Sequence, residues 1–502
     1  MKQPKAGNPP KTLNNHLDEN GHLVMDNVMS HQNTHPTITI QSDKLNLKVD
    51  LIGGVVVGAN LPQFTQSLSD KTPVTVLTDK ARDFQVVEFG VVGDYDVRFH
   101  LASKELKLKP NQNELKVVLA GKTAKGIDIS KELTLKRGQY DVQVSTKVAN
   151  NTKAAWSGHF YQQIKRAEPA TEQGIGRRTY HGMSFYQDKK PYTKLDYSDM
   201  RKRDLNTDVK GGWVAGQQHY FLTALIAPKG LTQNYFSSTH DNDSKYVLGM
   251  FAPKFTLAPG ETTSYNSKLY VGPEDVAALD KLAPGLGMTI DYGFLWFLSD
   301  ALMWILRKIQ LVVGNWGVAI MLTTLLVKLV FYGFSDKSFR SMARMSALAP
   351  KIKELQEQHK DDKQKLQQAM MEFYAKEKLN PMSGCFPMLV QLPFFIALYW
   401  MLIESVELRQ APFFGWIHDL SVKDPMYILP LIMGGSMLLQ QLMSDTKTQD
   451  SSQKQMMMIM PIVFTFVFMN FPAGLVLYML TNNILSMAQQ AYVKRQIARK
   501  HA

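Results

Sequence analysis

A single lysine, Lys328, interrupts an otherwise apolar run at residues 315–334 and is the side chain best placed to do chemistry. At about 1.5 Å per residue, a helix of this length spans about 30 Å, the thickness of the hydrocarbon layer of a bilayer. An ammonium group at that depth costs on the order of 3 kcal/mol, so an intramembrane lysine indicates a functional site. The alternative is that the lysine stem carries the charge to the membrane surface.

Other polar side chains interrupt the apolar runs of the second half of the chain. Besides Thr323 and Thr324, one turn before the lysine, they are Gln391, Gln440, Gln441, Thr465, Asn482, Asn483 and Gln489. Buried amides and hydroxyls need partners or water, although one amide per helix is an ordinary contact between helices. Glu404 is the acidic candidate to pair with Lys328, but it falls near the outer end of its helix, whereas Lys328 falls near the inner end of its own. An unpaired lysine therefore implies a wet cavity open to the cytoplasm.

Composition separates two unlike parts of this 502-residue chain, which carries a net charge of +13. Much of the basic excess lies beside apolar runs, which points to membrane topology and anionic lipid. No recognition-helix or zinc signature indicates sequence-specific nucleic acid binding. The one cysteine, Cys385, excludes an internal disulfide and a cysteine-based metal cluster.

Residues 37–271 alternate apolar and polar side chains, with turns at Gly53-Gly54, Arg137-Gly138 and Pro259-Gly260. This pattern predicts an all-β sandwich. No nucleophile elbow, phosphate loop or metal-ligand spacing occurs there, so the sequence assigns no catalysis to this domain.

Polar and apolar segments alternate in the remainder of the chain. Residues 291–314 are amphipathic and aromatic, which predicts a helix at the membrane surface, the alternative being one long span continuing through the lysine run. Residues 335–384 read as a helical hairpin of two arms with a polar tip at His359-Lys360-Asp361. The hairpin, the Lys447/Lys454 loop and the basic tail fall on one side, which the positive-inside rule makes cytoplasmic.

The predicted organisation is thus a β-sandwich followed by a bundle of five transmembrane helices with a cytoplasmic helical hairpin. The segments are a flexible linker at 1–36, a periplasmic β-sandwich at 37–285, an interfacial amphipathic helix at 286–314, transmembrane helices at 315–334, 385–406, 426–443, 456–471 and 473–492, the cytoplasmic hairpin at 335–384, a periplasmic loop at 407–425, a cytoplasmic loop at 444–455 and a basic cytoplasmic tail at 493–502.

Several segments together make the chain resemble the YidC family of membrane protein insertases, in the Gram-negative form with a large periplasmic domain. They are "GNWGVAIMLTTLLVKLVFY", "LNPMSGCFPMLVQLPFFIALYWML", "SVELRQAPFFGWIHDLSVKDPMYILP", "FPAGLVLYMLTNNILSMAQQ", "KGGWVAGQQHYF" and "LTLKRGQYDV". The resemblance covers nearly the whole chain beyond residue 37. It implies a non-enzymatic insertase and chaperone of the bacterial inner membrane, without a cofactor, metal or nucleotide hydrolysis.

The resemblance also implies a mechanism and its residues. A positively charged groove attracts acidic or polar segments of a nascent protein, whose apolar helix then slides out along residues 385–406 and 456–471. The groove candidates are Lys328, Thr324, Thr323, Gln391, Gln441, Asn482 and Tyr478. The slide candidates are Pro387, Met388, Phe394, Met458, Met460 and Phe464, and the hairpin candidates are Met342, Met345 and Tyr374. The implied partners are nascent membrane proteins, the Sec translocon, the ribosome and signal-recognition targeting machinery, and membrane lipids.

Two departures from the family pattern stand out. Lys328 occupies the groove position that usually holds arginine; both carry a positive charge, but they differ as hydrogen-bond donors. Residues 1–36 supply no apolar signal-anchor helix, so we expect the sequence to start downstream of the natural start. A transporter or channel is the rival function, since it too needs a polar intramembrane cavity, but it predicts inverted repeats and paired charges that the sequence lacks. An anchored carbohydrate-active enzyme would need paired carboxylates and leaves the hairpin unexplained.

Overall fold

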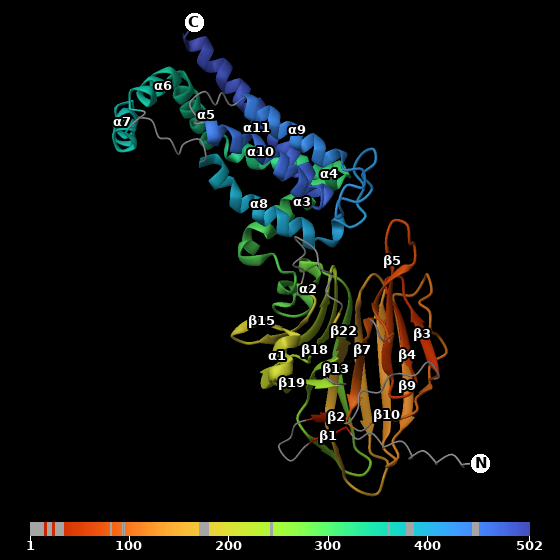
Figure 1. The fold of residues 1–502 in the computed structure, drawn as a ribbon. Helices are drawn as coiled ribbons and strands as arrows, with labels where there is room; N and C mark the ends of the chain where they lie inside the picture. The colour runs from red at the N-terminus through yellow and green to blue at the C-terminus, as the bar shows by residue number, and fades with distance from the viewer. Residues whose placement is uncertain are drawn as a thin grey trace, which may run out of the picture. The chain divides into compact units, whose positions relative to one another are not determined.

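The computed structural model describes residues 15–17, 23–25, 35–80, 83–92, 94, 96–169, 180–240, 244–359, 362–377, 386–443 and 451–501. The chain divides into two compact units. The β unit comprises Met1–Gln173 and Arg177–Ile290, and the helical unit comprises Gly174–Gly176 and Asp291–Ala502. Each is described by itself (Figure 1).

The β unit consists mainly of two nine-stranded antiparallel sheets. The first sheet runs in the order β15 (Lys190–Leu195), β14 (Met183–Gln187), β17 (Trp213–Gln218), β18 (Phe221–Ile226), β22 (Thr262–Pro273), β11 (Asp141–Ala149), β10 (Asp128–Lys136), β9 (Glu114–Lys122) and β8 (His100–Leu101). The second runs β16 (Asn206–Lys210), β19 (Thr232–His240), β20 (Lys245–Phe251), β13 (Phe160–Ala167), β7 (Gln85–Val91), β5 (Val55–Thr65), β4 (Asn46–Asp50) and β3 (Thr37–Gln41), with β6 (Pro73–Leu77) paired to β5. The predicted β-sandwich is confirmed.

Alternation of side chains builds these strands as the sequence predicted. Along β11, every second residue from Val142 is buried and the residues between them face outwards. The predicted turns also occur. Those at Gly138 and Gly260 need a glycine, because these residues have φ values of 75° and 85°. Two short helices, α1 (Tyr197–Lys202) and α2 (Val276–Leu282), complete the unit, and β12 (Trp156–Gly158) pairs with β21 (Phe255–Leu257). Within residues 1–36, β1 (Asn15–Leu17) pairs with β2 (Leu23–Met25).

A buried lysine joins the two sheets. The Nζ of Lys131, on β10, lies 2.9 Å from the Oδ2 of Asp94, and both side chains are at most 1% exposed. The same ammonium donates to the carbonyls of Gly53 and Phe89 at 2.6 Å. Gly90 makes room for the pair, because a Cβ there would lie 2.0 Å from the Asp94 carboxylate. The charge is thus paired and hydrogen-bonded, as a buried ammonium must be.

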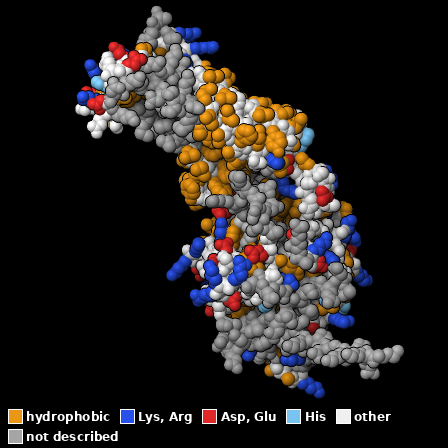
Figure 2. Space-filling view, in the orientation of Figure 1, with side chains coloured by type: hydrophobic (Ala, Val, Ile, Leu, Met, Phe, Trp, Pro, Cys, Tyr) orange, Lys and Arg blue, Asp and Glu red, His pale blue; other side chains and the backbone are white. Residues whose placement is uncertain are grey.

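The helical unit contains nine α-helices among its described residues. They are α3 (Trp296–Val313), α4 (Trp316–Val330), α5 (Tyr332–Ala347), α6 (Ala349–Gln358), α7 (Lys363–Lys376), α8 (Phe386–Glu404), α9 (Ile428–Met443), α10 (Ser451–Phe468) and α11 (Ala473–His501). Gly314 ends α3 with a φ of 69°, and the Asn315 side chain caps α4 by accepting from the Val318 amide. Exposed hydrophobic side chains gather over this unit in Figure 2; Leu439, Phe466 and Ile484 are 53%, 66% and 50% exposed.

Helix boundaries differ from several predicted segments: α3 begins at Trp296 rather than 286, α10 begins at Ser451 inside the predicted loop, and α11 continues to His501. Two further differences bend or break a predicted element. The run 315–334 bends by 66° between α4 and α5, so α5 begins inside the run that was predicted as one span. The first arm of the predicted hairpin is broken at Leu348 into α5 and α6, because Pro350 lacks an amide proton and stands in the first turn of α6.

None of the described helices is by itself both long and apolar enough to cross a bilayer. The bent pair of α4 and α5 together has the necessary length and hydropathy. Shorter apolar helical stretches lie at Val390–Glu404, Ile428–Met443 and Met458–Phe468.

Candidate functional site

Lys328 lies in the last turn of α4 and points at two other helices. Its Nζ donates to the Oγ of Ser486 on α11 at 2.8 Å and to the Oε1 of Gln391 on α8 at 3.4 Å. Among the described residues no carboxylate pairs with this ammonium. Three helices therefore converge on one positive charge that has only neutral partners.

A second set of hydrogen bonds orients these partners. The Gln391 amide donates to the Asn482 side chain, and the Ser486 hydroxyl donates to the Asn482 backbone carbonyl at 2.7 Å. The buried Tyr478 shares a hydrogen bond with Gln391. Tyr478, Asn482 and Ser486 follow one another at a spacing of four, so they lie on one face of α11. We name Lys328, Gln391, Tyr478, Asn482 and Ser486 the lysine cluster.

Four of the predicted groove residues belong to the lysine cluster, and three do not. The Thr324 hydroxyl donates to the Ile320 carbonyl of its own helix at 2.7 Å. The Thr323 hydroxyl is buried and finds no partner among the described residues. Gln441, on α9, makes no hydrogen bond within the described part of the chain and lies half-exposed.

Ser486 was missed by the sequence reasoning, although it is the nearer of the two partners of Lys328. A serine in an apolar helix is usually a small packing residue, so its type carried no signal. Its spacing did carry one, because Ser486 lies one turn beyond Asn482 on the face that already held two candidates.

The far end of α4 is covered by the segment between α8 and α9. Gly317, in the first turn of α4, lies against Phe413: a Cβ there would come within 2.1 Å of the ring. The amide of Gly474, at the start of α11, donates to the Leu420 carbonyl at 2.9 Å. Gly317 precedes Lys328 by a helical rise of about 16 Å. The helices are therefore covered at one end, and the lysine cluster lies towards the other.

A buried aspartate fixes this covering segment. Asp424 is 0% exposed, and its carboxylate accepts from the Trp416 indole at 2.9 Å and from the Leu429 amide, at the start of α9, at 2.7 Å. An acid that caps the first turn of a helix also interacts favourably with the helix dipole. Arg307, on α3, pairs with Glu407 at the other end of the segment.

The two helices of the predicted slide meet through aromatic rings. Phe395 on α8 and Phe468 on α10 have ring centroids 6.5 Å apart, and Tyr399 and Phe471 have centroids 5.6 Å apart. Beyond these contacts two predicted slide residues of α10 are exposed, Met458 by 40% and Met460 by 43%.

The remaining slide candidates occupy varied positions. Phe464 is half-buried, with its ring centroid 6.2 Å from that of Phe468. Phe394 lies 4.8 Å from the ring of Phe331, at the bend between α4 and α5. Pro387 and Met388 belong to α8, but their side chains lie outside the described residues.

The predicted hairpin is anchored to α11 at its base. Arg340, on α5, pairs with Asp336 at 2.7 Å and donates to the Gln496 side chain at 2.7 Å. Met345 and Tyr374 are half-buried, whereas the side chain of Met342 lies outside the described residues.

Comparison with protein families matches two models that together span most of the chain. Residues 37–305 match the model described as the YidC periplasmic domain, and residues 308–500 match the one described as 60Kd inner membrane protein.

Curated relatives match over the same extent. The membrane protein insertase YidC of Coxiella burnetii (strain RSA 493 / Nine Mile phase I) is 46% identical over 468 residues, which cover 91% of this chain and 82% of the relative. The protein of the same description from Pseudomonas fluorescens (strain Pf0-1) is 43% identical over 473 residues, covering 92% and 84%.

Among solved structures, one described as an active YidC insertase with the first transmembrane domain resolved is 18% identical over 90% of this chain and 91% of its own, with a TM-score of 0.41. A galactose mutarotase-like protein from Lactobacillus casei ATCC 334 covers 47% of this chain with a TM-score of 0.34.

Proposed function

This chain belongs to the YidC family of membrane protein insertases, and on that premise we propose how its own residues carry out insertion. The protein is a non-enzymatic insertase of the inner membrane with a periplasmic β-domain and a helical membrane region. Its substrates are nascent membrane proteins. Our proposal is that the lysine cluster is the point at which an acidic or polar segment of such a substrate first enters the membrane region.

The observation that carries this proposal is the set of neutral partners around Lys328. Its ammonium is held by a hydroxyl and an amide oxygen, with no carboxylate in pairing distance among the described residues. A lysine in a resting ion pair would have to lose its partner before it could attract another anion. This lysine keeps its charge available for an incoming carboxylate.

The energies involved are of matching size. A carboxylate moved to the centre of a bilayer costs about 3 kcal/mol. Two opposite charges 4 Å apart attract by about 4 kcal/mol at an effective dielectric constant of about 20. One lysine in a partly wet groove therefore offsets the cost of one substrate carboxylate, and lysine serves this purpose as well as arginine does. Lysine lacks the planar fork that would grip the carboxylate in two places.

The covered end of the helices supports a one-sided groove. We propose that the segment at 407–425 faces the periplasm and that the hairpin at 335–384 and the tail at 493–502 face the cytoplasm. In this topology the spans are 315–334, 385–406, 426–443, 456–471 and 473–492, with 286–314 on the membrane surface. A substrate then enters past the hairpin, meets Lys328, and is kept from passing straight through by the contacts of Gly317 and Asp424.

The exposed apolar side chains of α10 support the slide. We propose that the substrate helix leaves the groove along α8 and α10, where Met458 and Met460 offer adaptable apolar contacts. The Sec translocon, the ribosome, the signal-recognition targeting machinery and membrane lipids are the proposed partners of this route. The hairpin, anchored through Arg340 and Gln496, is the proposed contact for the delivering machinery.

Crosslinking of a stalled nascent chain tests the route. A photoreactive residue replaces Met460 in one variant and Leu311 in another; Leu311 is 75% exposed on α3 and serves as a control outside the slide. The proposal predicts an adduct with the nascent chain from position 460 and none from position 311. Equal adducts from both positions would show that the chain meets lipid-exposed surface at random.

A further inference from the structure

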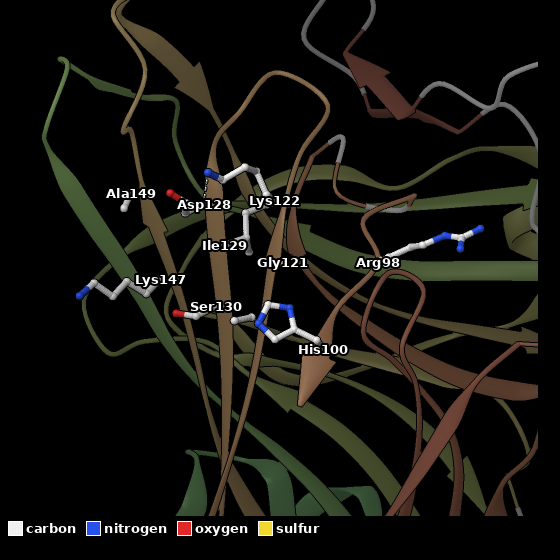
Figure 3. Close-up of a pocket in the computed structure, with 10 residues that line it drawn as sticks. Arg98, His100, Gly121, Lys122, Asp128, Ile129, Ser130, Lys147 and Ala149 are labelled. Atoms are coloured by element: carbon white, nitrogen blue, oxygen red, sulfur yellow. Dashed lines mark ion pairs between the residues drawn. The ribbon is translucent and has the colours of Figure 1, made fainter. Parts of the chain in front are cut away.

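The β unit carries a groove that the insertion mechanism does not use. It has a volume of about 610 Å³ and lies on the outer face of the first sheet, near its β8 edge (Figure 3). Ser130 and Lys147 are partners across β10 and β11, Ser130 and Ala120 across β10 and β9, and Ala120 and His100 across β9 and β8. One row of residues therefore crosses four strands.

The floor of the groove is built from small side chains. Ala120, Ser130 and Ala149 face outwards from adjacent strands, while the alternate residues of these strands, such as Lys131, point into the core. Gly121 lets the segment before β8 lie close to β9, because a Cβ there would come within 2.6 Å of the Val97 side chain. That close approach brings Arg98 to the rim.

The rim is cationic. Arg98, His100, Lys122 and Lys147 line the groove, and Asp128 is the one carboxylate among its lining residues. Asp128 is already neutralised: its Oδ1 lies 3.1 Å from the Lys122 ammonium, and its Oδ2 accepts from the Asn151 amide at 2.7 Å. Among the described residues no carboxylate pairs with Arg98 or Lys147. The groove therefore has a surplus of positive charge.

The dimensions favour an extended anion over a small one. The row from Lys147 on β11 to His100 on β8 crosses three strand spacings, or about 14 Å. Figure 3 shows Arg98 and Lys147 at opposite ends, with Ser130 and His100 between them. A single phosphate cannot contact both ends. An extended polypeptide, at about 3.3 Å per residue, spans the row with about four residues.

The lining also argues against other large anions. No Phe, Tyr or Trp is among the lining residues, so no large aromatic ring there stacks on a nucleobase or a sugar ring. Ile129 is the one large apolar side chain among the lining residues, and at 2% exposed it offers an acyl chain little apolar surface. We propose that this groove binds acidic, extended polypeptide segments, and, resting on the proposed function, that these are periplasmic segments of inserting substrates.

The test is binding of a fluorescein-labelled peptide of alternating aspartate and serine to the full chain in detergent, followed by fluorescence anisotropy at low salt. The double variant Arg98→Ala/Lys147→Ala is expected to weaken binding roughly tenfold, since it removes two exposed charges. The control Lys229→Ala/Lys254→Ala removes two exposed lysines of the same unit away from the groove and is expected to leave binding unchanged. The variant Arg98→Lys/Lys147→Arg is expected to restore binding.

Three results would overturn the inference. The first is equal binding by the groove variant and the wild type. The second is equal binding of a peptide with asparagine in place of aspartate. The third is displacement of the peptide by inorganic phosphate at the same total charge, which would indicate a small-anion site. Because Lys328 is intact in these variants, failure here leaves the lysine cluster untouched, and failure of the Lys328 variants leaves this binding measurement untouched.

Discussion

The Nζ of Lys328 on α4 lies 2.8 Å from the Oγ of Ser486 on α11, and the Ser486 hydroxyl itself donates a hydrogen bond to the Asn482 backbone carbonyl. The serine is both an acceptor for the charge and a donor to its own helix. It holds the ammonium in place without neutralising it. A carboxylate at position 486 would have stabilised the lysine better and left it unable to attract a substrate.

Removing this hydroxyl is expected to weaken insertion without abolishing it. A hydrogen bond to a charged group contributes about 1.5–3 kcal/mol, and in Ser486→Ala the amide of Gln391 remains as a second partner. We expect a severalfold fall in insertion of a small one-span substrate, measured in cells depleted of their own insertase. The control Thr481→Val removes a hydroxyl whose one partner among the described residues is the Leu477 carbonyl of α11. If both variants insert equally well, Ser486 has no special role in holding the lysine.

Packing between α9 and α10 depends on one of two adjacent glycines. A Cβ at Gly434 would lie 2.0 Å from the Thr465 hydroxyl, whereas a Cβ at Gly435 would meet nothing within 4 Å. We expect Gly434→Ala to destabilise the helical unit by about 1–3 kcal/mol through overpacking. Gly435→Ala is expected to leave stability unchanged or to raise it, since alanine favours helix by up to about 1 kcal/mol.

Thermal unfolding of the purified chain in detergent measures both effects. Adding Thr465→Ala to Gly434→Ala removes the clashing hydroxyl and is expected to recover most of the loss. A larger loss from Gly435→Ala than from Gly434→Ala would show that the two helices pack differently.

The buried pair in the β unit provides a third test. Lys131→Met leaves the Asp94 carboxylate buried and uncompensated, so we expect a loss of about 3–5 kcal/mol. Faster hydrogen exchange of the β7 and β10 amides in the full chain is the readout. The double variant Lys131→Met/Asp94→Asn removes both charges and is expected to lose less than the single variant.

Lys122→Met is the matched control, because it breaks an ion pair whose side chains are 59% and 36% exposed. An exposed pair contributes at most about 1 kcal/mol, so exchange in β7 should hardly change. A double variant less stable than Lys131→Met would contradict the idea that the unpaired charge causes the loss.

The sequence predicted much of the fold because alternation and turn residues act locally. Strand β11 and its glycine turn at Gly138 follow directly from period-two patterning and from the need for a positive φ. The bend between α4 and α5 was not predicted, since Phe331 itself is neither proline nor glycine and the nearby Gly333 lies inside α5. The burial of Lys131 could not be predicted either, because a lysine in an alternating strand ordinarily faces water.

At the site, the sequence identified the charge but not all of its partners. Lys328, Gln391, Asn482 and Tyr478 were candidates because polar side chains in apolar runs are costly. Thr324 was a candidate for the same reason, yet its hydroxyl is satisfied by its own helix, an option open to threonine but not to lysine. Whether a polar side chain bonds its own helix or another one depends on how the neighbouring helices pack, which no local sequence pattern predicts.

Insertion by charge variants of Lys328 tests the central claim most directly. In cells depleted of their own insertase, a one-span substrate with an acidic translocated segment is scored for protease-accessible insertion. Lys328→Arg keeps the charge and is expected to insert normally. Lys328→Glu replaces an attraction of about 4 kcal/mol by a repulsion of similar size and is expected to abolish insertion. Normal insertion by both Lys328→Ala and Lys328→Glu would contradict the role of this lysine.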